Sequence, residues 1–235
     1  ALIFPIFENN CLASHTEKYR KHITEKAYDK MNDKILEWAM KIQSISQIGL
    51  AYCKDPFDRE RYEDLREISA EMLAERTGIS EEKAREVFLC EEGYQTPKVD
   101  TRAAIFRDGK ILMVHEKNGT WSLPGGWCDV DRSIATNTVK EVKEETGLDA
   151  TAEKLIAIQD WRLHNVRNYV YGVLKAFVLC SVAGGAFEEN IETVGIEYFA
   201  RDELPERLAV EKTTREQILM CFDANENRSK ETLFD

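Results

Sequence analysis

The chain has 235 residues, 43% of them hydrophobic, and its 32 basic and 43 acidic side chains give a formal net charge of −11. This size and apolar content allow one large domain or two modest domains, each with a buried core. The negative field repels nucleic acids and anionic membrane surfaces, so we expect neither as a partner.

The cysteines and the start of the chain indicate the compartment. The six cysteines lie far apart, and none belongs to a C-x-x-C pair, which argues against a structural zinc site and a disulfide framework. The apolar run at residues 2–7 is broken by Pro5 and follows no basic region, so it fits neither a signal peptide nor a membrane span. We therefore expect a cytoplasmic protein.

The first part of the chain is predicted to be helical. Residues 1–23 show no clear periodicity, and we assign them no structure or function. Residues 24–94 are expected to form a small helical domain. Apolar residues recur at mostly helical spacing over residues 24–50, and further helices are predicted over residues 55–78, with an Asp-Pro start and a terminal glycine, and over residues 80–90.

The pattern becomes strand-like at Gln95, so we assign residues 95–235 to a second domain. Strands over residues 99–106 and 110–115 are joined by Asp108-Gly109, a strong hairpin signal. One prominent helix is predicted over residues 133–146, with strands on either side of it. This order predicts an α/β or α+β sandwich. The other predicted elements are strands at 153–161, 168–182 and 190–199, a turn at Gly184-Gly185, and helices at 202–208 and 212–222.

The prominent helix carries three glutamates on one side, Glu141, Glu144 and Glu145, which repel one another by roughly 0.2–0.5 kcal/mol per pair. At 100° per residue they border a predicted apolar face, whose members are Ile134, Ala135, Thr138, Val139 and Val142. A solvated charge face is the usual meaning of such residues. Beside a buried face, however, clustered carboxylates suit Mg²⁺ or Mn²⁺, and a backbone carbonyl of Gly125 or Gly126 could join them.

Seven residues within positions 126–148 form a recognisable motif. They are Gly126, Glu141, Val142, Glu144, Glu145, Gly147 and Leu148. They resemble the Nudix hydrolase box and match seven of its nine defined positions. The resemblance implies an α/β/α sandwich with a mixed sheet, dependence on Mg²⁺ or Mn²⁺, and hydrolysis of a nucleoside diphosphate linked to another moiety. Together with the helical domain, it is closest to a bacterial subgroup of ADP-ribose pyrophosphatases with CDP-choline pyrophosphatases as kin. Members of the family are commonly dimers, so we expect a homodimer.

Two positions depart from the box. Arg132 stands where the family has a glutamate, and Lys140 where it has an arginine. In the family these two residues form a salt bridge that joins the loop to the helix. Two basic residues cannot pair with each other, so we expect Asp129 or Asp131 to pair with one of them.

The resemblance implies attack of water on one phosphorus of a pyrophosphate. It gives Glu141 and Glu145 as the metal ligands, with Glu144 as a further ligand or a supporting contact. The general base could be Glu141 or a glutamate of the later loop, among Glu188, Glu189 and Glu192, and we place Glu192 among the catalytic candidates.

Substrate contacts are expected from residues 159–165, which leave a strand and mix an aromatic ring with polar groups. Trp161 could stack on a base, and Arg162 or His164 could hold phosphate. The alternative is that Trp161 belongs to the core and the others to a solvated loop.

A rival interpretation concerns residues 73–80, which with the helix after them resemble a helix-turn-helix. Some Nudix proteins are transcriptional regulators that sense nucleotide sugars, a different class of function. Residues 54–92 contain 7 basic and 13 acidic side chains, a net charge of −6. A DNA-binding domain is expected to present a basic face, so the charge disfavours this interpretation.

Overall fold

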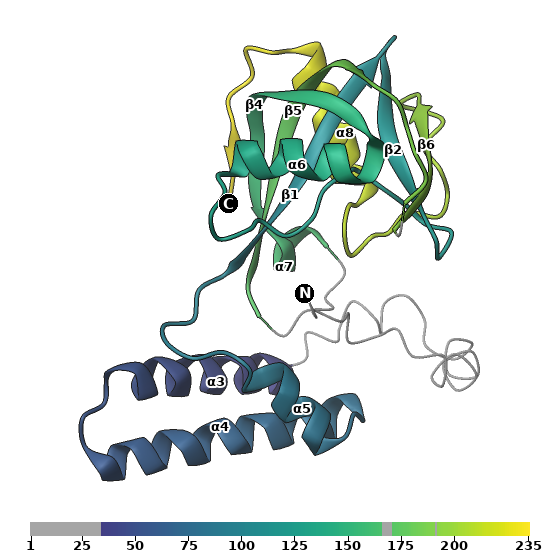
Figure 1. The fold of residues 1–235 in the computed structure, drawn as a ribbon. Coiled ribbons are helices and arrows are strands. Elements are labelled where there is room, and N and C mark those ends of the chain that lie inside the picture. Colours follow the sequence, from purple (N-terminus) through teal and green to yellow (C-terminus); the bar gives the residue numbers. More distant parts are fainter. Residues whose placement is uncertain (1–33, 166–170, 191) are drawn as a thin grey trace. The chain divides into compact units, whose positions relative to one another are not determined.

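The protein is described by a computed structural model over residues 34–165, 171–190 and 192–235, and its chain forms two compact units (Figure 1). The first unit contains three helices, α3 (Lys34–Tyr52), α4 (Pro56–Thr77) and α5 (Glu81–Phe88). Residues 24–33, where the first helix was predicted to begin, lie outside the described residues. The third helix ends two residues earlier than predicted. In the part of the chain that the structure describes, no helix is both long and apolar enough to cross a membrane.

The predicted ends of α4 are confirmed by its caps. The Asp55 side chain accepts hydrogen bonds from the backbone N–H groups of Phe57 and Asp58, and Pro56 occupies the first turn. Gly78 ends the helix with a φ of 73°, a left-handed conformation that glycine adopts without strain. The three helices share a core of small and aromatic side chains: Ala39, Ala70, Leu73, Ala74, Ala84 and Phe88.

The second unit is built on a seven-stranded mixed sheet. Its strands are β1 (Lys98–Arg107), β2 (Lys110–Glu116), β3 (Trp121–Ser122), β4 (Leu148–Asp160), β5 (Val173–Gly185), β6 (Thr193–Phe199) and β7 (Leu233–Phe234). The order is β3-β2-β1-β5-β4-β7, and β6 pairs with β2. β1 runs parallel to β5, whereas β2 and β4 run antiparallel to their neighbours β1 and β5.

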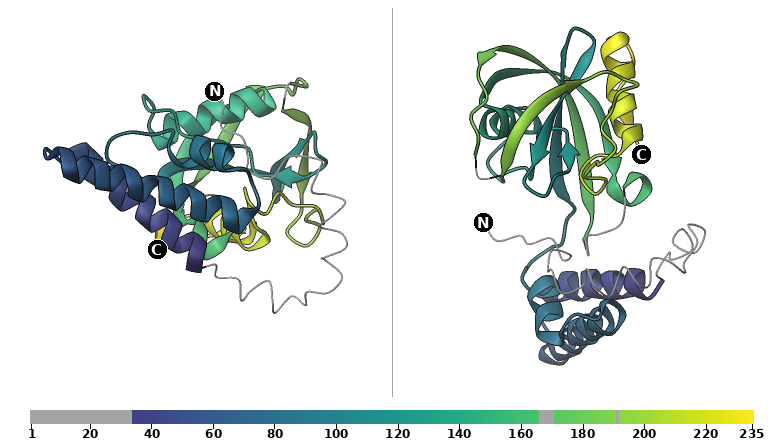
Figure 2. Two further views of the ribbon diagram at one scale, coloured as in Figure 1. Left: turned by 90° about the horizontal axis from the view of Figure 1, so that it is seen from below. Right: turned by 90° about the vertical axis from the view of Figure 1, so that its right-hand side faces the viewer.

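Helices α6 (Ile134–Thr146) and α8 (Arg215–Glu226) lie on opposite faces of this sheet (Figure 2). Strand residues alternate between the two faces, so Ala103 and Ile105 pack with Val142 of α6, whereas Ala104 and Phe106 pack on the side of α8. The predicted α/β/α sandwich with a mixed sheet, preceded by a small helical domain, is confirmed.

Several predicted elements need correction. Gly184-Gly185 is the end of β5 rather than a turn, because both residues pair with the start of β4. No helix forms over residues 202–208. There the Arg207 carbonyl accepts a hydrogen bond from the Trp121 N–H at 2.9 Å, so the backbone pairs with β3 instead. The sequence also gave no sign of β3, β7 or the short helix α7 (Trp161–His164).

The buried face of α6 differs from the prediction at one end. Thr138 and Val142 are buried as expected, but Ala135 is exposed and Asn137 is fully buried. The Asn137 side-chain amide donates to Thr101 Oγ1 at 2.9 Å and to the Trp127 carbonyl at 3.2 Å. These polar contacts orient the first turns of the helix, which hydrophobic periodicity cannot reveal.

A cluster of three buried charges lies between β1 and β5. The Asp100 carboxylate accepts from Arg102 Nε and Nη2 at 3.0 and 2.7 Å, and from Lys175 Nζ at 2.7 Å. Arg102 also donates to the Leu123 carbonyl at 3.2 Å and Lys175 to the Lys212 carbonyl at 2.9 Å. Burial alone would raise the pKa of Asp100, but the charges of Arg102 and Lys175 outweigh it and hold the pKa below its usual range.

We predict that Asp100→Asn destabilises the protein by about 3–5 kcal/mol at pH 7, because it leaves two buried cations uncompensated. The folded-state pKa of Asp100 is lowered, so its contribution is present above the unfolded pKa of about 3.9 and is lost as pH falls through the folded value. Urea unfolding at several pH values, followed by circular dichroism, measures this. The difference between the variant and the wild type should shrink on acidification.

The control is Asp223→Asn, which removes a surface carboxylate 2.6 Å from Arg201 Nη2 and should cost about 1 kcal/mol or less. Equal losses in the two variants would contradict a special role for the buried cluster.

Candidate active site

A glycine-containing loop, residues 123–128, lies along the part of β1 that β2 leaves open. β2 pairs with β1 only at Phe106 and Arg107. Below that point the loop takes the place of a strand: the N–H groups of Ala103 and Thr101 donate to the Pro124 and Gly126 carbonyls, each at 2.8 Å. The loop is therefore held in place by the sheet rather than by its own side chains.

The two glycines of this loop have different requirements. A Cβ atom at Gly125, whose φ is 146°, would lie 1.9 Å from the Thr101 carbonyl oxygen, so this position needs glycine. A Cβ atom at Gly126 would lie 2.8 Å from Glu141 Oε2, the end of a flexible side chain that can shift. The close approach of the loop to β1 therefore depends on Gly125. The Gly126 carbonyl accepts the Thr101 N–H and so faces β1, which makes Gly125 the better candidate for a backbone ligand.

The glutamates of α6 have different environments. Glu145 Oε2 accepts a hydrogen bond from the Gly125 N–H at 2.9 Å. Burial raises the pKa of Glu145 to about 8, although the charges of Arg102 and Lys212 and the Gly125 N–H act in the opposite direction. Burial also raises the pKa of Glu141, whereas the Glu144 side chain is 57% exposed. Two partly buried carboxylates that are costly to ionise would be stabilised by a bound cation.

The ammonium group of Lys140 lies among the carboxylates. Its Nζ is 3.3 Å from Glu141 Oε1 and 3.1 Å from Glu144 Oε2. Within the described residues, no three His, Cys, Asp or Glu side chains converge as a formed metal site. The chemistry of the donors fits a hard divalent cation, since all are oxygens. In this arrangement Lys140 compensates the charges of Glu141 and Glu144.

The two departures from the Nudix box meet at Asp129. Its Oδ2 lies 3.1 Å from Lys140 Nζ and 3.5 Å from Arg132 Nε. Of the two aspartates expected to replace the missing salt-bridge partner, the structure thus selects Asp129.

Glu192 lies in a loop that is tied to the end of α6. The Asn190 side-chain amide donates to the carbonyls of Glu144 and Glu145 at 3.1 and 3.2 Å. Its Oδ1 accepts from the N–H groups of Glu192 and Thr193 at 3.0 and 2.9 Å. One side chain therefore fixes the backbone that carries Glu192 to the helix that carries the other glutamates.

The residues expected to contact substrate lie at the start of α7. In the sheet, Lys175 of β5 lies between Asp100, near the start of β1, and Gln159, near the end of β4. Helix α7 follows β4 directly, so it lies at the end of the sheet where β1 begins. Trp161 is 1% exposed and thus belongs to the packed interior, where its ring has no free face for a base.

Arg162 and His164 are more accessible. Arg162 pairs with Asp160, and His164 Nε2 lies 2.9 Å from Asp235 Oδ1. A role for these two residues in phosphate binding stays a prediction.

Sequence reasoning missed two cations near the glutamates, Arg102 and Lys212, whose charges act on Glu145. Lys212 Nζ also contacts Glu116 Oε2 at 2.8 Å, and Glu116 accepts from Ser122 Oγ at 2.9 Å. Asp100 and Arg102 could have been noticed as two opposite charges at alternate positions of a strand with an otherwise apolar interior. Lys212 is one of many lysines in polar segments, and the sequence gives no sign of its position.

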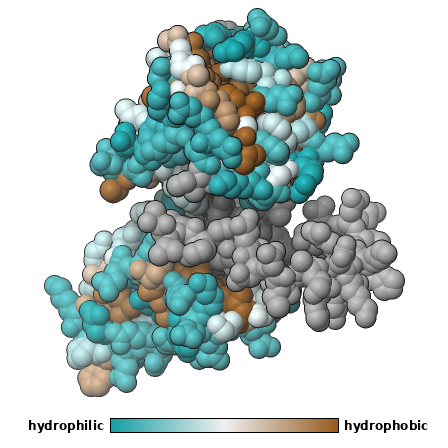
Figure 3. All heavy atoms as spheres, turned by 45° about the vertical axis from the view of Figure 1, so that its right-hand side comes forward, coloured by the Kyte–Doolittle hydropathy of each residue, from teal (hydrophilic) through white to brown (hydrophobic). Residues whose placement is uncertain are grey.

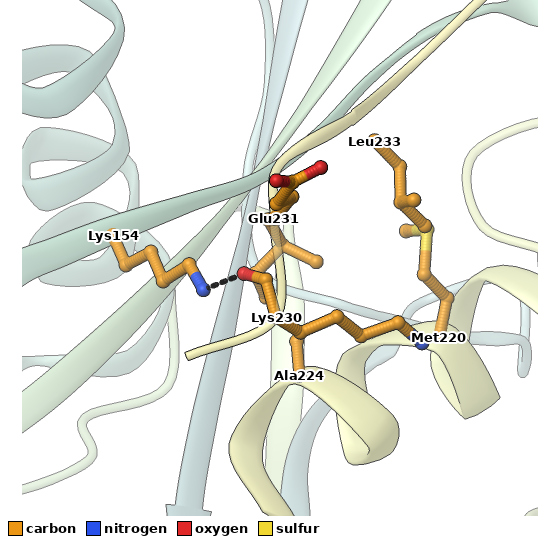
Figure 4. A pocket seen from close by; sticks show the side chains of 7 residues that line it. Lys154, Met220, Ala224, Lys230, Glu231 and Leu233 are labelled. Atoms are coloured by element: carbon orange, nitrogen blue, oxygen red, sulfur yellow. Dashed lines mark hydrogen bonds between the residues drawn. The ribbon is translucent and has the colours of Figure 1, made fainter. Parts of the chain in front are cut away.

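A hollow beside the C-terminal strand has no role in this site. It is lined by Lys154, Met220 and Leu233 among others, and Lys154 Nζ donates to the Lys230 carbonyl across it (Figure 4). It has no room for even a water-sized molecule. A substrate site is therefore better sought at the glycine loop and α6.

Both units of the chain are similar to known proteins. Residues 96–219 match the NUDIX domain, and residues 33–88 match the UDP-X-like, N-terminal oligomerisation domain. The provisionally named ADP-ribose pyrophosphatase YjhB of Bacillus subtilis is 42% identical over 207 residues, covering 88% of this chain and 99% of its own.

Two solved structures are also similar. An ADP-ribose pyrophosphatase from Streptococcus suis is 51% identical with a TM-score of 0.56, and the match covers 60% of this chain and all of that one. A UDP-X diphosphatase is 34% identical with a TM-score of 0.57, covering 86% of this chain and 98% of that one. Nudix hydrolases generally use a divalent metal, which suits the oxygen donors gathered here. The chain belongs to the Nudix family and is a Nudix pyrophosphohydrolase.

Proposed function

We propose that this protein hydrolyses ADP-ribose to AMP and ribose 5-phosphate in a reaction that depends on Mg²⁺ or Mn²⁺. The observation that carries the proposal is the approach of the Gly125-Gly126 loop to Glu141 and Glu145, which brings bare backbone against partly buried carboxylates. The similarity to the Streptococcus suis and Bacillus subtilis proteins supports ADP-ribose as the substrate. The similarity to the UDP-X diphosphatase supports a UDP-linked compound as the second candidate.

In the proposed mechanism, Glu141, Glu144, Glu145 and the Gly125 carbonyl hold the metal. A bound divalent cation would neutralise the pyrophosphate and lower the pKa of a water molecule. The chain would contribute carboxylates spaced by a helix and a loop that is anchored to the sheet, and these would orient the phosphates. Arg162 and His164 are proposed to contact a phosphate at the edge of the site. CDP-choline and other nucleotide-linked alcohols or sugars remain alternatives, because the base-contacting residues are not identified.

The substrate prediction is tested by phosphate release in a coupled phosphatase assay with Mg²⁺ or Mn²⁺. The panel is ADP-ribose, UDP-sugars, CDP-choline, dinucleoside polyphosphates and nucleoside triphosphates. We expect ADP-ribose to be turned over fastest, and Glu145→Gln to lower the rate by about 100-fold or more, because it removes a charged ligand. Glu226→Gln, a change on the exposed face of α8, is the matched control and should be neutral. Faster turnover of a UDP-sugar would transfer the assignment to the second candidate.

We further propose Glu192 as the general base, supported by the Asn190 contacts that tie its loop to α6. Glu141 is the alternative. The two differ in that Glu141 is also proposed to hold the metal, whereas Glu192 is not.

Glu192→Gln is therefore expected to lower kcat by about 10²-fold or more, while the Mg²⁺ concentration for half-maximal rate stays unchanged. Glu203→Gln, an exposed glutamate outside this loop, is the control and should retain activity, whereas Glu188→Gln and Glu189→Gln test the other two candidates of the loop. If kcat survives in Glu192→Gln but falls together with metal affinity in Glu141→Gln, the base is Glu141.

We propose that the helical unit forms a homodimer. Trp38, Ile45 and Tyr52 of α3 are 56%, 52% and 68% exposed. Residues seven apart on a helix differ by only about 20° in direction, so these three form one apolar stripe. Figure 3 shows hydrophobic residues among hydrophilic ones on the surface of this unit. The matched family description, an oligomerisation domain, supports the same role.

Ile45→Glu is expected to convert the dimer to a monomer, because burying a carboxylate in an apolar interface is costly. Sedimentation velocity measures the change. Glu60→Lys, an exposed charge reversal on α4 outside the stripe, should leave the dimer intact. A wild-type monomer at micromolar concentration would contradict the proposal.

The helix-turn-helix interpretation is less well supported. α4 and α5 do flank a glycine turn, but Arg85 of the second helix is engaged by Glu67 and Glu81. We propose that the protein acts on a nucleotide without binding nucleic acid or membranes. The cysteine pattern supports a cytoplasmic location.

A further inference from the structure

We propose that Asp129 is a positioning residue, which holds the Lys140 ammonium aside so that Glu141 and Glu144 can bind a divalent cation. The inference rests on the proposed metal dependence, and it goes beyond it by assigning a role to a residue outside the set of ligands.

The geometry gives Lys140 three competing partners. Its Nζ lies 3.1 Å from Asp129 Oδ2, 3.3 Å from Glu141 Oε1 and 3.1 Å from Glu144 Oε2. An ammonium group has three N–H donors, so it can satisfy all three carboxylates at once. A cation on Glu141 and Glu144 must displace Lys140 from both of them. Asp129 then remains as the partner that compensates the charge of the displaced ammonium.

The position of Asp129 does not depend on these ion pairs. Its N–H donates to Asn137 Oδ1 at 3.1 Å, and its carbonyl accepts the Arg132 N–H at 3.0 Å. Asn137 is fully buried in α6, so the turn is fixed to the same helix that carries the glutamates. Replacing the side chain by asparagine removes the charge and leaves the backbone contacts of the turn in place.

Position 132 offers a way to restore the missing charge. Arg132 Nε lies 3.5 Å from the same Asp129 Oδ2 that contacts Lys140, so the two basic side chains approach one point from different sides. A glutamate at position 132 would bring a carboxylate toward Lys140. Asp131, in contrast, is exposed and makes no ion pair within the described part of the chain.

The test is direct binding of Mn²⁺, measured from the electron paramagnetic resonance signal of the free ion, in parallel with the Mn²⁺ dependence of turnover. We expect Asp129→Asn to weaken Mn²⁺ binding about fivefold, the effect of losing one partly exposed ion pair of about 1 kcal/mol. Asp131→Asn removes the same charge from the same turn and should bind Mn²⁺ like the wild type.

The rescue is the double variant Asp129→Asn with Arg132→Glu, which should return to within about twofold of wild-type affinity. Arg132→Glu alone should gain little, because Asp129 already compensates Lys140. This comparison separates a specific pairing from the general attraction of Mn²⁺ by added negative charge, which would be equal in both backgrounds.

Unchanged binding in Asp129→Asn, equal losses in the two asparagine variants, or equal gains from Arg132→Glu in both backgrounds would each overturn the inference while leaving the metal site intact. Absence of Mn²⁺ binding by the wild type would overturn both the inference and the proposed metal dependence.

Discussion

The buried charge cluster of Asp100, Arg102 and Lys175 is the interaction on which the arrangement of the second unit depends. Strand β1 could pack with apolar residues alone, and buried ion pairs seldom add net stability over such packing. This cluster instead connects β1 and β5 to two other segments of the unit. Through Arg102 it reaches the Leu123 carbonyl at the start of the glycine loop, and through Lys175 it reaches the Lys212 carbonyl ahead of α8. The two segments that border the glutamates are thus anchored to one buried carboxylate.

The same cluster sets the electrostatics of the site. Two buried cations against one buried anion leave an excess of one positive charge inside the sheet. Of the two cations, Arg102 is the one whose charge acts on Glu145, and it partly offsets the effect of burial on the pKa of that carboxyl. The electrostatic environment of the glutamates is therefore set by a residue of the sheet as well as by residues of their own helix. A positive contribution thus reaches the candidate site within a protein whose overall net charge is −11.

The parts of the fold that follow local rules were predictable, and the parts that depend on distant contacts were not. Capping residues and glycines predicted both ends of α4, and the predicted helix over residues 133–146 agrees with α6, which Ser133 caps at its start and Gly147 at its end. The chain over residues 202–208 was predicted helical because its backbone partner, Trp121 of β3, lies far away in sequence. Likewise, Trp161 reads as a loop aromatic until the packing of β4 and β5 shows it to be buried. Of the candidate site, the helix, the spacing of its glutamates and Lys140 were predictable, whereas the position of Lys212 was not.

The environment of Lys140 shows how the Nudix box can change without losing its geometry. The spacing of Glu141, Glu144 and Glu145 is set by the helix, and the approach of the loop by glycine, so neither tolerates much variation. The ion pair that joins the loop to the helix can be formed in more than one way. It requires only that one carboxylate of the loop reaches the basic residue at position 140. Asp129 meets that requirement from a turn that Asn137 fixes to the helix. In this chain, therefore, Asp129 supplies the counter-charge to Lys140 that a residue at position 132 does not supply.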